Sequence, residues 1–338
     1  MRAISRIPLL LCVRLLVAQT TTDAVEAFHH GHYAESRQIL EKILLASPND
    51  SVARTFLALI RAATGECQAA KGELQQQFDR NPEASLKRLA GIAFVDCNLA
   101  QNRFQEIWPV LEKLQSSFPD DADVLYEAAK VHMKAWNGLV AQMYQKAAAS
   151  YRVNQLSGEI FETQGRYRDA AAEYRKAIEK NSTALNLHFR LGRALLLESH
   201  DPANLAAARK EFEAELLLNP SDAVAEYQVG QILLAEHDSP GAAIRFERAV
   251  RLNPDFAEAV LALAKTKPAA EAIPLLERAI KLQPANESAH YSLMLAYRNA
   301  GRNADAQREK EVFDKLSRPP EGEFTEFLKK LGEKPTKP

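Results

Sequence analysis

The feature that most constrains this chain is a helix-ending signal that returns about every 34 residues. Apolar runs with helical spacing end one after another at Pro or Ser, and these stops lie at Pro48, Pro82, Pro119, Ser150, Ser182, Pro220, Pro254 and Pro284. Successive stops are 30 to 38 residues apart. Proline does not continue a helix, and a period of this length fits one pair of antiparallel helices. The sequence therefore predicts a repetitive, all-helical fold.

The residues between the stops have the pattern of a helical hairpin. Two helices cross closely only where their side chains are small. Small residues recur on the expected first helices at Ala24, Ala58, Ala129, Gly158, Gly192, Gly230 and Ala264. They recur on the expected second helices at Ala70, Ala170, Ala208, Ala242, Ala272 and Ala306. Larger residues follow one turn later and are expected to fill the space between stacked helices: Leu40, Leu74, Leu111, Tyr174, Phe212, Phe246 and Leu276.

Glycine punctuates several of the expected hairpins. Gly31, Gly65, Gly165 and Gly301 fall between paired helices. Glycine can end a helix in the left-handed conformation at little steric cost. We therefore expect a tight turn at each of these four positions.

This pattern resembles that of the tetratricopeptide-repeat (TPR) proteins, and in style that of bacterial secreted and envelope TPR proteins. The resemblance covers about Thr20 to Leu316. It implies an open, right-handed α-α superhelix, a solenoid of about nine helix-turn-helix units whose first helices line a concave surface. We expect three parts: a leader at 1–19, the TPR array at 20–316, and a tail at 317–338 with a short amphipathic stretch from Phe324 to Leu331.

Some segments depart from the pattern. The unit from Asp120 to Ser150 has no clear second-helix signature, so we expect a local distortion there. The unit after Pro254 is about four residues short, which predicts a short first helix. Ile92 fills a small-residue slot, and Gln77 and Glu215 stand where alanine is usual.

The expected concave surface carries aromatic rings that alternate with Arg and Lys. Rigid rings and arginines are the anchors that dominate many protein interfaces. We therefore predict a partner-binding groove, mainly from Tyr126 to Tyr291, for an extended or helical segment of another protein. Its residues are Tyr126, Lys130, Arg152, Gln155, Phe189, Arg193, Tyr227, Gln231, Tyr291 and Arg298. The alternative for each ring is simple packing against a neighbouring helix.

Cys67 and Cys97 are expected at the start of a second helix and near the end of the next first helix. These two ends can meet, so an oxidising compartment would permit a disulfide between them. The alternative is a pair of buried thiols, which a cytosolic location would favour.

Catalytic patterns are not found. The sequence has no GxSxG, HExxH, GxxxxGK[ST] or GxGxxG motif. His29, His30 and His32 cluster in an expected turn, but no Cys, Asp or Glu completes a known metal spacing. Periodic glutamates are explained by solvated helix faces. We therefore expect no enzyme activity, no metal and no cofactor.

The amino terminus has the layout of a secretory signal peptide. Arg2 and Arg6 precede an apolar stretch from Ile7 to Ala18, although Arg14 interrupts it. We therefore expect export, to the periplasm or beyond, with no membrane span in the mature chain. An uncleaved first helix in a cytoplasmic protein is the alternative.

The net charge of the chain argues against nucleic acid as a general binding partner. The formal net charge is −1, from 43 basic and 44 acidic residues, which does not fit a general nucleic-acid binder. The sequence favours a protein-protein interaction scaffold or adaptor in a bacterial cell envelope, with another protein or peptide as partner. The alternatives are a cytosolic co-chaperone or assembly adaptor and, less favoured, a regulatory subunit of an enzyme. Self-association through the ends of the array is a further expectation from the resemblance.

Overall fold

The computed structural model describes residues 20–317, and its regular structure there consists of helices. The chain divides into two compact units, the first ending at Met143 and the second beginning at Tyr144. The predicted leader at 1–19 and the amphipathic stretch expected at Phe324 to Leu331 lie outside the described residues. No helix among the described residues is both long and apolar enough to cross a membrane.

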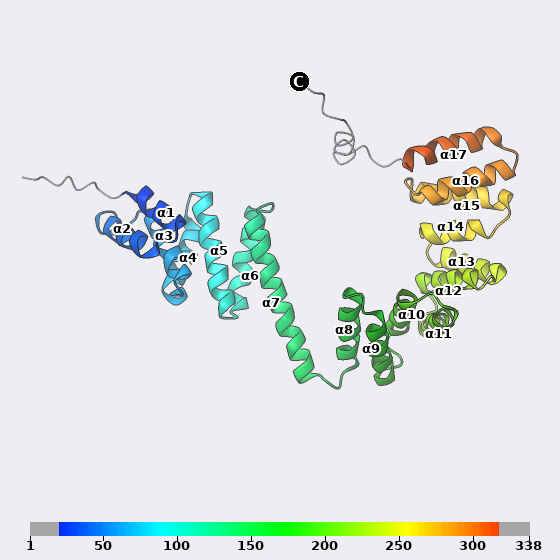
Figure 1. Cartoon of the computed structure of the whole chain (residues 1–338), viewed down its shortest axis with the longest axis horizontal. Coiled ribbons are helices and arrows are strands. Elements are labelled where there is room, and N and C mark those ends of the chain that lie inside the picture. Colours follow the sequence, from blue (N-terminus) through cyan, green and yellow to red (C-terminus); the bar gives the residue numbers. More distant parts are fainter. Residues whose placement is uncertain (1–19, 318–338) are drawn as a thin grey trace, which may run out of the picture. The chain divides into compact units, whose positions relative to one another are not determined.

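The first unit contains three helical hairpins followed by one long helix (Figure 1). The hairpins are α1 (Thr21–His29) with α2 (Tyr33–Ala46), α3 (Ser51–Ala63) with α4 (Cys67–Arg80), and α5 (Ala84–Ala100) with α6 (Phe104–Ser117). The long helix is α7 (Ala122–Lys146), whose residues from Tyr144 onward belong to the second unit.

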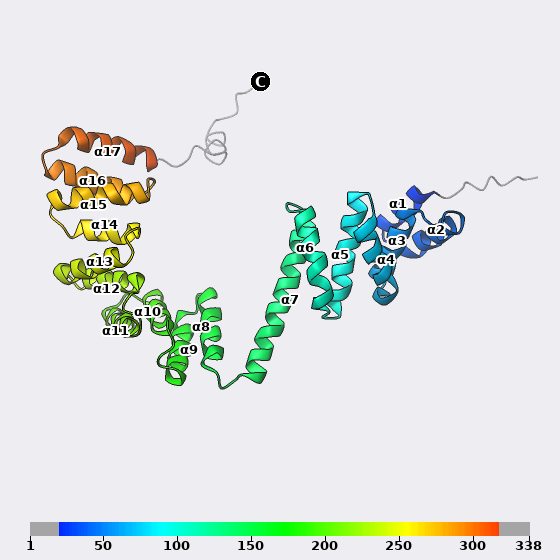
Figure 2. The ribbon, with the colours of Figure 1, turned by 180° about the vertical axis from the view of Figure 1, so that it is seen from behind.

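The second unit contains five hairpins that follow one another in a stack, as seen from both sides in Figures 1 and 2. They are α8 (Tyr151–Thr163) with α9 (Tyr167–Lys180), α10 (Leu187–Glu198) with α11 (Pro202–Leu218), α12 (Ala223–Ala235) with α13 (Ser239–Leu252), α14 (Ala257–Lys265) with α15 (Ala269–Leu282), and α16 (Glu287–Asn299) with α17 (Asn303–Leu316). The predicted all-α solenoid architecture is confirmed, and α14 is short, with nine residues, as expected.

Left-handed residues close most of the hairpins. Gly31, Gly65, Gly165 and Gly301 have φ between 70° and 85°, which confirms the predicted turns. Two further hairpins use residues that the sequence did not single out: Asn102 with φ 58° and His237 with φ 64°. Asparagine and histidine are among the side chains that tolerate this conformation best, so the turn geometry survives without glycine.

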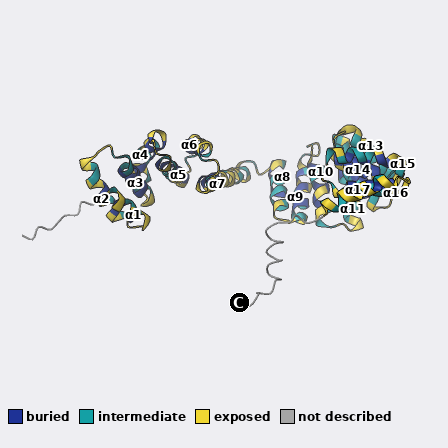
Figure 3. Cartoon of the chain, turned by 90° about the horizontal axis from the view of Figure 1, so that it is seen from above, coloured by how far each residue is buried: buried dark blue, intermediate teal, exposed yellow. Residues whose placement is uncertain are grey.

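The core is built from small residues on first helices that receive large side chains from second helices. A Cβ atom at Gly158 would lie 2.5 Å from the Tyr174 ring, and one at Gly230 would lie 2.5 Å from the Phe246 ring. Figure 3 shows the buried residues between the packed helices. All seven large residues predicted to fill this space are buried: Leu40, Leu74, Leu111, Tyr174, Phe212, Phe246 and Leu276.

The segment from Asp120 to Ser150 differs from the expected unit. It is not a distorted hairpin: most of it is the single 25-residue helix α7, so the described residues contain eight hairpins and one lone helix instead of about nine units. Ala129, expected to be buried in a small-residue slot, is exposed. The physical reason is that no second helix of the same unit covers this face of α7.

Candidate partner-binding surface

The predicted groove residues lie on first helices, but not in one unit. Tyr126 and Lys130 lie on α7 in the first unit. The other eight lie on first helices of the second unit, with Arg152 and Gln155 on α8, Phe189 and Arg193 on α10, Tyr227 and Gln231 on α12, and Tyr291 and Arg298 on α16. The predicted groove from Tyr126 to Tyr291 therefore has residues in both units, and the residues of each unit are described in turn.

The rings of the second unit are partly used in packing. Phe189 contacts Phe212 edge to face, with ring centroids 5.3 Å apart. Tyr227 lies between Phe246 and Phe256, at 5.8 Å and 5.0 Å. Burial raises the pKa of Tyr227, and the nearby Glu258 adds to this effect. The rings of Phe189 and Tyr227 thus fill space between helices. The part of each ring that remains accessible is available to a partner.

Tyr291 is more accessible than the other two rings. Its ring contacts Phe313 of α17, with centroids 5.4 Å apart, while 45% of the residue remains exposed. Leu261, at the corresponding position of α14, is buried. The apolar anchors available in this unit are therefore Phe189, Tyr227 and Tyr291.

Two arginines of α10, Arg190 and Arg193, have carboxylate partners on the preceding first helix α8, whereas Arg152 donates a hydrogen bond to Gln155 at 2.8 Å. Arg193 Nη2 lies 2.7 Å from Glu162 Oε2, and Arg190 Nη2 lies 3.2 Å from Glu159 Oε1. Such pairs tie successive first helices together and neutralise the guanidinium groups. The surface is thus unlike an open cationic clamp for a terminal carboxylate.

On α7, Tyr126 is exposed and Lys130 is held by acidic neighbours. Lys130 Nζ lies 2.7 Å from Asp96 Oδ1 and 2.8 Å from Glu127 Oε2. Burial acts to lower the pKa of Lys130, but hydrogen bonds to Asp96 and Glu127 outweigh it and the pKa is raised. Lys130 also lies 5.4 Å from the centroid of the Tyr126 ring. Its charge therefore serves first to join α7 to α5.

A recess that the sequence did not predict lies on the first helices of the first unit. It encloses about 480 Å³ and is lined mainly by apolar residues of α1, α3 and α5, including Phe28, Leu59, Leu89, Ile92 and Ala93. Asp96 supplies a carboxylate beside these side chains. The sequence signal was present in Ile92, whose size exceeds that of its slot. The recess itself forms only where α1, α3 and α5 come together, and its residues Phe28, Leu59 and Leu89 lie 30 or more positions apart in the sequence.

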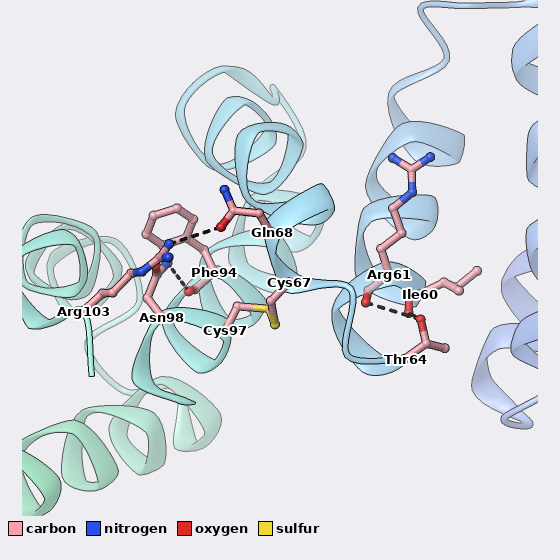
Figure 4. The surroundings of a disulfide bond; sticks show 9 residues. All are labelled: Ile60, Arg61, Thr64, Cys67, Gln68, Phe94, Cys97, Asn98 and Arg103. Atoms are coloured by element: carbon pink, nitrogen blue, oxygen red, sulfur yellow. Dashed lines mark hydrogen bonds between the residues drawn. A yellow bond between two sulfur atoms is a disulfide. The ribbon is translucent and has the colours of Figure 1, made fainter. Parts of the chain in front are cut away.

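A disulfide forms one wall of the recess. Cys67 begins α4 and Cys97 lies near the end of α5, as expected, and the structure joins them with a Cα–Cα distance of 5.4 Å (Figure 4). Next to it, Asn98 Nδ2 donates a hydrogen bond to the Phe94 carbonyl at 2.8 Å, and Arg103 Nη1 donates one to Gln68 Oε1 at 3.3 Å (Figure 4). The bond therefore connects the second and third hairpins beside an apolar surface.

The histidine cluster lies at the first hairpin of the part of the chain that the structure describes. No group of three His, Cys, Asp or Glu side chains converges there. His30 and His32 lie on the exposed turn of the first hairpin, at 4.0 Å from Glu26 and 3.9 Å from Glu35. This geometry fits ordinary surface pairs.

Comparison with known families gives two matches. Residues 157–223 match a family described as tetratricopeptide repeat, and residues 196–318 match one described as bacterial transcriptional activator domain. The two matches overlap within the stack of hairpins. No curated protein matches the sequence.

Solved structures similar to this chain include those of two proteins, MamA and YrrB. One is MamA, with 21% identity and a TM-score of 0.43, which covers 47% of this chain and 93% of its own. A second MamA structure, from Desulfovibrio magneticus RS-1, has 18% identity and a TM-score of 0.46, with coverage of 51% and 97%. The other is YrrB, described as a TPR protein with an unusual peptide-binding site, with 18% identity and a TM-score of 0.46 over 56% and 97% of the two chains.

The tetratricopeptide-repeat match begins within α8 and runs through α9, α10 and α11 to the first residue of α12. The same hairpin geometry recurs in both units on either side of α7. Residues 157–223 therefore carry the match to the tetratricopeptide repeat, within a longer series of helical hairpins.

Proposed function

We propose that this chain is a protein-interaction scaffold, without catalytic activity of its own, that binds an extended or helical segment of a partner protein on its first helices. The observation that carries this proposal is the recess of about 480 Å³ that α1, α3 and α5 enclose with apolar side chains. A recess of this size accepts one or two apolar side chains of a peptide.

The second unit offers a complementary surface for the same work. Phe189, Tyr227 and Tyr291 repeat on α10, α12 and α16, and polar or paired charged residues lie between them. Because Arg190 and Arg193 are already paired with carboxylates, apolar contacts are expected to supply most of the affinity near Phe189. The peptide-binding site in the description of YrrB is in line with this proposal.

The proposed location is the bacterial cell envelope or the exterior. The leader-like residues 1–19 and the Cys67–Cys97 pairing support it, because disulfides persist in oxidising compartments. A cytosolic co-chaperone or assembly adaptor would instead keep both thiols reduced and the leader intact. Mass spectrometry of the protein purified from its native cells, with thiol alkylation, measures both properties at once.

The binding proposal is tested with a defined probe. Random peptides displayed on phage are selected against the immobilised full chain, and the strongest selected peptide is synthesised with a fluorescent label. We expect Ile92→Glu, or Phe189→Ala together with Tyr227→Ala, to weaken its binding at least about tenfold. The matched control is Leu45→Glu, since Leu45 is 86% exposed on the second helix α2.

Fluorescence polarisation gives the dissociation constants, and circular dichroism verifies that each variant remains folded. The control is expected to bind within about twofold of the unaltered chain. Selection of no peptide, or equal binding by all variants, would contradict the proposal.

A further inference from the structure

Helix α7 lacks the covering helix that every other first helix has. In the hairpins of the second unit, a small residue of the first helix receives a ring, as Gly158 receives Tyr174 and Gly230 receives Phe246. Ala129 holds the corresponding place on α7 and is exposed. Figure 3 shows exposed residues along much of this helix. Within the first unit, the packing rule of the fold therefore leaves one face of α7 without a partner helix.

The uncovered face carries a continuous stripe of large and small residues. Its members are spaced alternately four and three residues apart, the spacing of a two-helix seam. They are Leu125, Ala129, His132, Trp136, Leu139 and Met143. Leu125 is 49% exposed, Trp136 51% and Leu139 61%. The stripe contains no Asp, Glu, Lys or Arg, so no fixed charge opposes its burial.

A hollow lies beside the stripe, between α6 and α7. It has a volume of about 480 Å³ and is lined by Trp108, Leu111, Glu112, Gln115, Ser116 and His132. The Trp108 and His132 rings lie 5.3 Å apart at its edge. One turn further along α7, Trp136 projects an exposed indole. The same surface thus presents the large side chain of Trp136 and a hollow that is large enough to receive an indole ring.

We propose that this face is the contact between two copies of the chain, with the two α7 helices antiparallel about a two-fold axis. In a two-fold contact the same surface meets itself, so it must be self-complementary. The stripe satisfies this condition when residue numbers on the two helices are paired symmetrically about position 134. Leu125 then lies opposite Met143 of the second copy, and Ala129 lies opposite Leu139.

The central layer of this arrangement uses the hollow. His132 lies opposite Trp136 of the second copy, so that this indole enters the space beside Trp108. Leu139 of the second copy covers Ala129, as Tyr174 and Phe246 cover their glycines within hairpins. In the layer of Ala129 and Leu139 a large residue thus meets a small one, and in the central layer the hollow beside Trp108 provides the space for the indole.

The exposed area agrees with an association of moderate strength. An aromatic side chain offers roughly 150–250 Å² when free, so half-exposed side chains of this kind leave roughly 100 Å² each. The stripe, with the neighbouring Met133, therefore contributes on the order of 500 Å² from each copy. That total of about 1,000 Å² lies at the lower limit of specific interfaces. We expect a dissociation constant in the micromolar range.

Sedimentation equilibrium of the full chain, from low micromolar to several hundred micromolar concentrations, measures the association. We expect a monomer–dimer equilibrium that Leu139→Glu weakens at least about tenfold. The double variant Ala129→Lys/Leu139→Glu places opposite charges across the contact and is expected to regain part of the affinity. The matched control is Leu217→Glu on α11, where Leu217 is 85% exposed, and it should leave the dimer unchanged.

Tryptophan fluorescence provides a second readout, since both tryptophans of the chain, Trp108 and Trp136, lie at the contact. Their emission should shift to shorter wavelength as the concentration rises. A monomer at all concentrations overturns the proposal. So does a dimer that Leu139→Glu does not weaken, or one that the double variant does not restore relative to Leu139→Glu.

Discussion

Glu215 illustrates how a single residue can serve the next helix as well as its own. Its carboxylate on α11 is fully buried and accepts hydrogen bonds from the backbone N–H groups of Asn186 at 2.7 Å and Phe189 at 3.3 Å. These groups lie at the start of α10, where free N–H groups and the helix dipole favour an anion. Glu215 therefore caps the helix that carries the ring of Phe189.

Removal of this cap is expected to destabilise the second unit. Glu215→Ala leaves two backbone donors without an acceptor, so we expect the free energy of unfolding to fall by about 2 kcal/mol. Urea denaturation followed by circular dichroism measures the change. Glu213→Ala on the same helix removes only surface ion pairs and should change the free energy by no more than about 0.5 kcal/mol. Equal losses in the two variants would be incompatible with the capping role.

At the scale of the element, the hairpin depends on how closely its two helices approach. Gly230 lets the Phe246 ring lie against the backbone of α12, and Gly158 does the same for Tyr174 on α8. Where the second helix is missing, as at α7, the corresponding position opens to solvent. A small residue is therefore needed at this position because the ring from the second helix occupies the space next to it, and not because the first helix itself needs a small residue.

Two glycine substitutions separate this packing effect from helix propensity. Gly230→Ala places a Cβ atom 2.5 Å from the Phe246 ring, so we expect it to destabilise the second unit by about 1–3 kcal/mol. Gly72→Ala, on α4, meets no atom within 4 Å and should stabilise the first unit by about 0.5–1 kcal/mol. Thermal unfolding of both variants checks the opposite signs. If both substitutions raised the unfolding temperature, helix propensity alone would explain the results. If both lowered it, crowding alone would explain them.

At the scale of the whole molecule, the chain is organised as two compact units, each with its own internal contacts. Repeat arrays gain stability mainly from neighbouring repeats, so a change in one part spreads only weakly. The Cys67–Cys97 disulfide belongs to the first unit and spans 30 residues of sequence. Its contribution is therefore expected to be local.

Reduction of the disulfide tests this local contribution. A loop of this length predicts a loss of about 3–4 kcal/mol in the first unit when the bond is absent. Hydrogen exchange read by mass spectrometry, with and without dithiothreitol, should show faster exchange in α3 to α6 and unchanged exchange in α10 to α17. The variant Cys67→Ala/Cys97→Ala should no longer respond to the reductant. Uniform acceleration along the chain would argue against two independent units.

The repeat period, the helix pairs and most core residues could be predicted from the sequence. The stops at Pro48 to Pro284, the four glycine turns and the large residues from Leu40 to Leu276 are local features, and local spacing is enough to find them. The left-handed turns at Asn102 and His237 were missed because these residues adopt that conformation only when the packed helices require it.

The geometry of the candidate partner-binding surface could be predicted only in part. First-helix positions follow from the period, so Phe189, Tyr227 and Tyr291 were placed on the correct helices. Their packing against Phe212, Phe246 and Phe313, and the pairing of Arg193 with Glu162, depend on contacts between elements. The same holds for the recess around Ile92, the cap formed by Glu215 and the uncovered face of α7. The sequence by itself thus determined which residues form helices and hairpins, because that information is local and periodic. The tertiary structure alone decided which side chains remain accessible, because accessibility depends on what the neighbouring helices cover.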